Sequence, residues 1–299
     1  MMRVPTRVNV VEVGPRDGLQ NEKASIATAD KIGFVDRLSI AGHSVIEVSA
    51  FVSPKWVPQM ADAAEVFAGI TRRPGVRYTA LVPNAAGLER ALGAGVTEVA
   101  IFAATSDTFS RRNINQSIDE SLANYAALCR ASLAAGIRVR GYLSTCFVCP
   151  FEGRIAPARV AEIAQRLIDL GVFEVAVSDT IGAAHPGQVI EVLDAVTKQV
   201  ALVQIALHFH DTRGTALANV LAGLDYGVTT FDSSAGGLGG CPYAPGAAGN
   251  LASEDLLFML HGLGIETGVS LDEVAKASRF IEPRLDHPLP SRFLRAPQL

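Results

Sequence analysis

The sequence has few cysteines and no long hydrophobic run. Only 4 of its 299 residues are cysteine, which is too few for a small secreted scaffold held by disulfides. No segment approaches the roughly 18 uninterrupted apolar residues of a membrane-spanning helix. The first residues also lack the apolar stretch of a signal peptide and lead directly into a predicted strand. We therefore expect a soluble protein in a reducing compartment, with no membrane partner.

The chain also lacks an excess of positive charge. Its 26 Lys and Arg residues face 30 Asp and Glu residues, which gives a net charge of −4. A general nucleic-acid binder needs a basic surface, so we expect no nucleic-acid partner. Hydrophobic residues make up 49% of the chain, which is enough for a large core and excludes a mainly disordered protein.

Eight short apolar runs alternate with segments of helical periodicity. The runs are Val8–Val13, Val45–Ser49, Tyr78–Val82, Glu98–Ala103, Arg138–Ser144, Phe173–Ser178, Ile205–His210 and Thr229–Ser233. The clearest helical segments are Ala29–Ala41, Ser117–Ala135, Pro157–Leu170 and Gly187–Val200. Nearly continuous apolar strands are typical of parallel sheets that are covered on both faces.

A glycine recurs after the predicted helices and before the next strand. These glycines are Gly42, Gly95, Gly136, Gly171 and Gly227, and each is expected to end a helix in the left-handed conformation. They recur roughly every 20–40 residues, which is the size of one βα unit.

Eight βα units in about 250 residues predict a (β/α)8 TIM barrel. A doubly wound sheet should carry a glycine-rich dinucleotide turn after an early strand, whereas here the first strand leads into Gly14–Asp17. We expect one catalytic barrel domain over residues 1–299, in which the residues after about 265 form a C-terminal helical extension. The tail from Arg284 to Leu299 contains three prolines and is expected to be irregular.

Polar side chains gather at the predicted strand ends, where TIM barrels place their chemistry. They are Arg16, Asp17, Glu47, Arg140, Tyr142, Asp179, His208 and His210. They come from five of the predicted strands, and Ser233 leads from the last strand into a glycine-rich segment. We therefore expect one site at this end of the barrel.

His208 and His210 form the most informative short pattern. Residues i and i+2 of a strand point to the same side, so both imidazoles face one space. A pair of hydrogen-bonded core histidines is the alternative, but two buried imidazoles without a metal are hard to satisfy. With Asp17 and an amide such as Asn250 they would offer a mixed N/O ligand set for Mg²⁺, Mn²⁺ or Zn²⁺.

Arg16 is expected to point away from its neighbour Asp17. Its guanidinium could donate to a carbonyl or enolate oxygen of a substrate, or pair with Glu47, and both can hold at once. Glu47 is then expected to orient Arg16 rather than to act as the base itself.

The segment Gly236–Asn250 is rich in glycine and contains Cys241, but it lacks the Lys-Ser/Thr ending of a phosphate-binding loop. We expect a lid that carries Cys241 over the mouth of the barrel; the alternative is a small buried apolar residue. Cys146 and Cys149 form a lone C-x-x-C and are expected to be structural. Trp56 is expected to pack within its loop, and His43 to lie on the surface or in a loop.

Four segments resemble the 3-hydroxy-3-methylglutaryl-CoA lyase family. They are VEVGPRDGLQNEK (Val11–Lys23), FVSPKWVPQM (Phe51–Met60), HFHDT (His208–Thr212) and GLGGCPYAPGA (Gly237–Ala247). The likeness extends roughly from Val8 to Ile281, and the long motifs are highly specific.

The resemblance implies roles for particular residues. Asp17, His208, His210 and Asn250 would bind Mg²⁺ or Mn²⁺, Arg16 would contact the substrate, and Cys241 would be the catalytic thiol. Glu47, Asp179 and Glu254 would be supporting acidic residues, and Asn113, Arg140 and Tyr142 would shape the acyl-CoA site. The resemblance also implies a homodimer or a higher homo-oligomer, and a cytoplasmic enzyme of the bacterial type.

The implied reaction splits 3-hydroxy-3-methylglutaryl-CoA into acetoacetate and acetyl-CoA. Asp17 or His208 would accept the C3 hydroxyl proton, and Cys241 would protonate the product enolate. The alternatives are a related Claisen-type synthase, a lyase for another 3-hydroxyacyl-CoA, and a non-catalytic metal-binding barrel. Arg213 stands where the family often has an aromatic residue, which bears on acyl preference.

Overall fold

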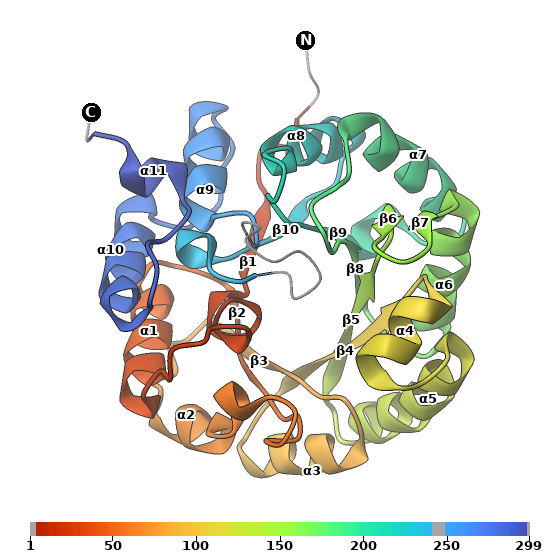
Figure 1. The fold of residues 1–299 in the computed structure, drawn as a ribbon, viewed down its shortest axis with the longest axis horizontal. Helices are drawn as coiled ribbons and strands as arrows, with labels where there is room; N and C mark the ends of the chain where they lie inside the picture. Colours follow the sequence, from red (N-terminus) through yellow and green to blue (C-terminus); the bar gives the residue numbers. More distant parts are fainter. Residues whose placement is uncertain (1–3, 241–248, 298–299) are drawn as a thin grey trace.

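Eight parallel strands close into a barrel in the computed structural model, which describes residues 4–240 and 249–297 (Figure 1). Around the barrel the strands follow the order β1-β10-β9-β8-β5-β4-β3-β2. They are β1 (Asn9–Glu12), β2 (Val45–Ala50), β3 (Arg77–Leu81), β4 (Glu98–Ala104), β5 (Arg138–Ser144), β8 (Glu174–Asp179), β9 (Ile205–Phe209) and β10 (Thr230–Ser233). The predicted TIM barrel is confirmed, and each predicted strand matches an observed one within about two residues at either end.

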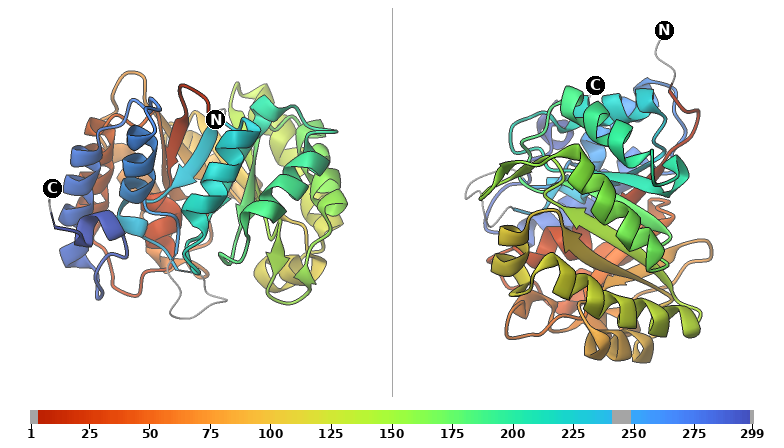
Figure 2. Two further views of the ribbon diagram at one scale, coloured as in Figure 1. Left: turned by 90° about the horizontal axis from the view of Figure 1, so that it is seen from above. Right: turned by 90° about the vertical axis from the view of Figure 1, so that its right-hand side faces the viewer.

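Helices surround the barrel, as the side views also show (Figure 2). They are α1 (Thr28–Ile40), α2 (Ala63–Gly69), α3 (Ala85–Gly93), α4 (Asp107–Ile114), α5 (Ile118–Ala134), α6 (Pro157–Asp169), α7 (Pro186–Val196), α8 (Ala216–Tyr226), α9 (Ser253–Gly262), α10 (Leu271–Ile281) and α11 (Arg292–Arg295). The two-residue strands β6 (Val148–Cys149) and β7 (Gly153–Arg154) form a small hairpin beside the barrel. All five predicted helix-ending glycines have positive φ, between 71° and 104°.

The strands are apolar because both of their faces are covered. Leu143, Val177 and Leu207 lie on neighbouring parts of the barrel, and all three are fully buried. They belong to one continuous core that also includes side chains from the surrounding helices. This close-packed core fixes the strand ends, so polar side chains that follow the strands are held in defined positions.

The C-terminal extension packs along the outside of the barrel against α1 (Figure 1). Arg37 of α1 stacks over the ring of Phe280 in α10, with 3.7 Å between the guanidinium carbon and the ring centroid. Beyond α10, the tail is not irregular throughout as expected, because α11 forms within it. The carboxylate of Asp255 accepts hydrogen bonds from the backbone N–H groups of Arg292 and Phe293, and so satisfies two orphan donors at the start of α11.

One other expectation is wrong. Trp56 does not pack within its loop, because it is 87% exposed. His43 lies in the loop between α1 and β2, as expected, but it is completely buried there, and its Nδ1 lies 3.4 Å from the carbonyl oxygen of Val10. Cys146 and Cys149 are both buried, in keeping with a structural role.

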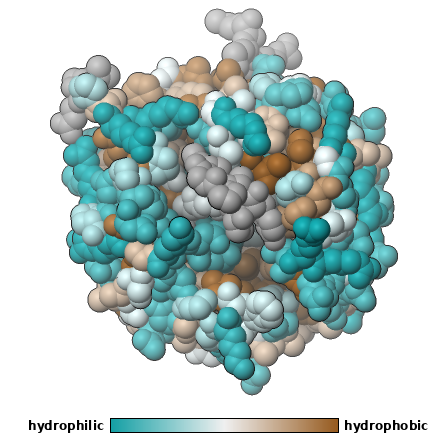
Figure 3. All heavy atoms as spheres, viewed as in Figure 1, coloured by the Kyte–Doolittle hydropathy of each residue, from teal (hydrophilic) through white to brown (hydrophobic). Residues whose placement is uncertain are grey.

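Hydrophilic side chains predominate around the rim of the face seen in Figure 3. Within the described parts of the chain, no helix is long and apolar enough to cross a membrane. The cytoplasmic location stays a prediction.

Candidate active site

A tight π-helical turn, η1 (Gly14–Gly18), places Arg16 and Asp17 at the C-terminal end of β1. The backbone N–H groups of Arg16, Asp17 and Gly18 all point to the carbonyl oxygen of Val13, at 2.7–3.2 Å. The expectation that Arg16 points away from Asp17 is wrong: its Nη1 donates to Oδ1 of Asp17 at 2.7 Å. The arginine side chain is long enough to fold back over this compact turn and reach its neighbour.

Arg16 is also held by Glu47, as expected. The Nε of Arg16 donates to Oε2 of Glu47 at 2.5 Å, and the hydroxyl of Tyr142 donates to the same oxygen at 3.2 Å. Glu47 is fully buried, and this burial raises the pKa of its carboxyl even though Arg16 opposes the shift. Two carboxylates therefore fix the orientation of the Arg16 guanidinium.

The two histidines meet Asp17 at the same end of the barrel. His208 lies in β9 and His210 follows it, and their ring centroids are 5.3 Å apart. The Nε2 atoms of His208 and His210 lie 3.9 and 4.0 Å from Oδ2 of Asp17. One possible ligand atom from each of the three residues lies within 4.8 Å of the others.

Asn250, in the segment between β10 and α9, lies beside His210. Its backbone pairs with that of His210 in an isolated antiparallel bridge, and its Nδ2 donates to the carbonyl oxygen of Leu238 at 3.1 Å. Within residues 4–240 and 249–297, Oδ1 of Asn250 and Nδ1 of His210 are buried without a hydrogen-bond partner. The orphaned Asn250 oxygen is an atom that a cation would satisfy.

The protonation states also suit a metal. Burial alone would raise the pKa of Asp17, but Arg16 and the two imidazoles lower it to about 2. Burial, with His208 as a second cause, lowers the pKa of His210 to about 4. At neutral pH the site therefore offers a carboxylate and a neutral imidazole, which are the forms that ligate metals. Oxygen and imidazole donors fit Mg²⁺, Mn²⁺ or Zn²⁺.

The residues expected to shape the acyl-CoA site lie in different surroundings. Asn113 is exposed in α4, which follows β4, while Tyr142 is buried beneath Arg16. Arg140 is also buried, and ion pairs join it to Asp232 and Glu174. Cys241 lies outside the described residues.

The supporting acidic residues bind backbone amides. Asp179 accepts hydrogen bonds from the N–H groups of Ala183 and Ala184, at 3.0 and 2.9 Å. Glu254 accepts one from the N–H of Gly236 at 2.8 Å. Both carboxylates therefore shape loops that follow strands. Arg213 also shapes the loop after β8, but as a donor: its Nη1 donates to the carbonyl oxygens of Ile181 and Gly182.

Two buried acidic residues escaped the sequence interpretation. Glu12 in β1 accepts hydrogen bonds from the N–H groups of Gly14 and Ala235 and from the hydroxyl of Ser253, at 2.7–2.9 Å. Asp232 in β10 contacts both Arg140 and His208. Each is a charged residue inside an otherwise apolar strand, and a buried charge needs a partner, so this pattern could have indicated both residues.

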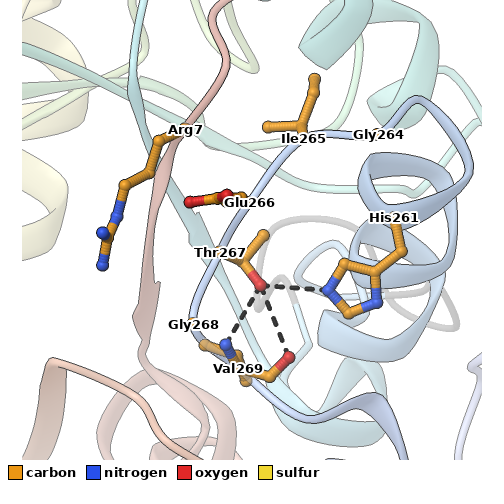
Figure 4. A pocket seen from close by; sticks show the side chains of 8 residues that line it. All are labelled: Arg7, His261, Gly264, Ile265, Glu266, Thr267, Gly268 and Val269. Carbon is orange, nitrogen blue, oxygen red and sulfur yellow. Dashed lines mark hydrogen bonds between the residues drawn. The ribbon is translucent and has the colours of Figure 1, made fainter.

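Hollows in the described surface lie at both ends of the barrel. One of about 220 Å³ borders the site, with Asn250 and Gly237 facing residues of the C-terminal tail. The other, of about 510 Å³, contains Arg7, His261 and Thr267 (Figure 4). Arg7 precedes β1, whereas Arg16 follows it, so the larger hollow lies at the opposite end of the barrel from the histidines. The Thr267 hydroxyl there is already bonded to His261 Nε2 and to the N–H of Val269.

Known proteins resemble this chain over nearly its whole length. A family model described as HMGL-like matches residues 7–281. The mitochondrial hydroxymethylglutaryl-CoA lyase of Bos taurus is 52% identical over 292 residues, covering 98% of this chain and 90% of that protein. The 3-hydroxy-3-isohexenylglutaryl-CoA/hydroxy-methylglutaryl-CoA lyase of Pseudomonas aeruginosa is 54% identical over 280 residues, covering 94% and 93%. The crystal structure of a hydroxymethylglutaryl-CoA lyase from Pseudomonas aeruginosa matches with a TM-score of 0.97 at 52% identity, covering 98% of both chains.

The ligand set predicts that metal binding depends on His210. Replacing it (His210→Ala) should weaken Mn²⁺ binding more than the roughly 10–100-fold that loss of an outer-shell partner costs. Titration of the metal-free protein with Mn²⁺, followed by electron paramagnetic resonance, measures the change. His261→Ala, at the opposite end of the barrel, is the matched control and should bind Mn²⁺ normally. Equal affinity of the His210→Ala variant and the unmodified protein would show that His210 is not a ligand.

Proposed function

Because the chain belongs to the HMGL-like family, we propose that it cleaves 3-hydroxy-3-methylglutaryl-CoA into acetoacetate and acetyl-CoA. The observation that carries the proposal is the meeting of Arg16, Asp17, His208 and His210 at one end of the barrel. More than half of the residues are identical to those of two lyases of this activity. A condensing synthase is less well supported, because the relatives named above are lyases.

Asp17, His208, His210 and Asn250 would hold a divalent cation, Mg²⁺ or Mn²⁺. When bound, such a cation supplies Lewis acidity, which lowers the pKa of an alcohol as it does that of water. The C3 hydroxyl proton would then pass to Asp17, because both ring nitrogens of His208, the other expected acceptor, would be occupied, Nε2 by the cation and Nδ1 by Asp232. Loss of this proton makes C3 a ketone carbon as the C2–C3 bond breaks.

The electron pair of the broken bond passes to C2 and spreads to the thioester oxygen as an enolate. Arg16 would donate to this oxygen, because its guanidinium has five N–H donors and only part of them are taken by Glu47 and Asp17. Such a donor contributes about 3–4 kcal/mol to the transition state in comparable sites.

Cys241 would complete the reaction by giving its thiol proton to C2, which yields acetyl-CoA. An ordinary thiol pKa of about 8.5 keeps this acid protonated at neutral pH. The proton accepted from the C3 hydroxyl returns to the thiolate through solvent, so that the catalyst is restored. The cysteine role rests on the sequence and the family, as does the expected homodimer.

A second candidate substrate carries a longer substituent than methyl at C3. The Pseudomonas aeruginosa relative is named for an isohexenyl substrate as well as the methyl one. Arg213 distinguishes this chain from the usual family pattern beside the histidines, and it shapes the loop after β8 through Ile181 and Gly182.

The direct test is an assay of the purified protein with 3-hydroxy-3-methylglutaryl-CoA and Mg²⁺ or Mn²⁺. We expect acetoacetate and acetyl-CoA in equal amounts, loss of activity after chelation, and recovery on return of the metal. The isohexenyl substrate, assayed in parallel, shows which side chain is preferred through kcat/KM. Absence of cleavage of both substrates, or full activity in protein verified to be metal-free, would contradict the proposal.

Arg16→Lys should be a poor replacement. Lysine is a point charge that cannot copy the planar guanidinium held between Glu47 and Asp17. We expect kcat to fall on the order of 10²–10³-fold, with a much smaller rise in KM, because the lost contact acts on the transition state. Arg166→Lys, on the outer surface of α6, is the matched control. An Arg16→Lys enzyme with normal kcat would limit Arg16 to a structural role.

Cys241→Ala should remove the acid while leaving Mn²⁺ affinity nearly unchanged. We expect kcat to fall on the order of 10²–10⁴-fold, the usual contribution of a general acid. Cys241→Ser should recover little, since a hydroxyl is a far weaker acid than a thiol. Cys129→Ala, at a buried cysteine of α5, is the control and should keep its turnover. Normal turnover of the Cys241→Ala variant would rule out the catalytic role.

A further inference from the structure

We propose that Asp232 is a positioning residue of the metal site, which keeps a proton on Nδ1 of His208 and thereby directs the Nε2 lone pair to the cation. The inference rests on the metal site of the proposed function. It adds a residue to that site from β10, a strand that none of the expected metal ligands occupies.

The contact between Asp232 and His208 is built into the barrel. Asp232 lies directly opposite His208 in the parallel pairing of β10 with β9. Its Oδ2 lies 3.2 Å from Nδ1 of His208, and the Asp232 side chain is completely buried. Because an ionised carboxylate only accepts hydrogen bonds, Nδ1 must be the donor. The free nitrogen of the ring is then Nε2, which faces Asp17.

Arg140 holds this carboxylate in its ionised form. Its Nη2 donates to Oδ1 of Asp232 at 2.8 Å and its Nη1 to Oδ2 at 3.1 Å, so the pair is bidentate. The Nε of Arg140 donates to Glu174 at 2.7 Å, which fixes the guanidinium from the other side. Arg140 therefore acts on the site through Asp232, without needing to touch the substrate.

The second imidazole has no such support. Among residues 4–240 and 249–297, Nδ1 of His210 has no hydrogen-bond partner. The two histidines of the motif thus differ at Nδ1: that of His208 contacts a carboxylate, whereas that of His210 does not. A carboxylate that orients a metal-binding imidazole makes the ring a better ligand, and its loss typically costs 10–100-fold in metal affinity. If Asp232 served only to neutralise Arg140, its removal would act on stability and not on the metal.

Titration of metal-free protein with Mn²⁺ separates these two roles. Asp232→Asn keeps the shape of the side chain but allows its amide N–H groups to face Nδ1 of His208, which disfavours the required tautomer. We expect its dissociation constant for Mn²⁺ to rise by about 10–100-fold. Glu174→Gln is the matched control, because it removes the other carboxylate on Arg140 and leaves His208 untouched. It should bind Mn²⁺ nearly as the unmodified protein does.

Nitrogen-15 spectra of histidine-labelled, Mg²⁺-loaded protein give a second readout that needs no stable Asp232 variant. The His208 signal, assigned by its absence in His208→Gln, should show the proton on Nδ1 with slow solvent exchange. A proton on Nε2, or unchanged Mn²⁺ affinity in folded Asp232→Asn, would overturn the inference alone. Failure of the unmodified protein to bind Mn²⁺ would overturn the proposed metal site, and the inference with it.

Discussion

The need to pair every charge that the barrel buries constrains the whole active end of this molecule. Arg16 is shared by Asp17 and Glu47, and Arg140 by Asp232 and Glu174. Removing one member of a buried pair leaves an uncompensated charge, at a cost of about 3–5 kcal/mol. Both arginines contact the Tyr142 ring, with their guanidinium carbons 5.2 and 5.0 Å from its centroid, so the two sets of charges are adjacent. Each of the two arginines is thus held by two carboxylates, and a substitution acts first on the arginine that it contacts.

Another buried carboxylate, that of Glu12, binds backbone N–H groups of two loops rather than an arginine. Glu12 binds the N–H of Gly14 in η1 and the N–H of Ala235 in the segment that leads to Cys241. Burial raises the pKa of the Glu12 carboxyl to about 8, although the Ser253 hydroxyl and the two N–H groups oppose this shift. A single side chain thus joins the turn that carries Asp17 to the start of the glycine-rich segment. The positions of these two loops are coupled through the barrel wall.

The sequence predicted what periodicity and glycine punctuation encode. The eight strands, the helix-ending glycines and the convergence of Asp17 with His208 and His210 all follow from local patterns and from barrel topology. The pairing of Asp232 with His208 depends on the register between strands, which no local pattern reveals. The exposure of Trp56 and the complete burial of His43 within its loop were not predicted for a related reason, since both depend on neighbours distant in sequence. The contact of Arg16 with Asp17 depends on the turn geometry after β1.

The residues of the proposed cation site lie on or just after three consecutive strands of the barrel, β1, β10 and β9, although Asp17 is separated from the others by most of the chain. Asp17 follows β1, His208 lies in β9 and Asn250 follows β10, and β1 pairs with β10 to close the ring. During synthesis on the ribosome, the first ligand emerges more than 190 residues before the second. These residues therefore cannot come together in the nascent chain until its last barrel strand has docked. In this architecture, ring closure precedes completion of the proposed cation site during maturation.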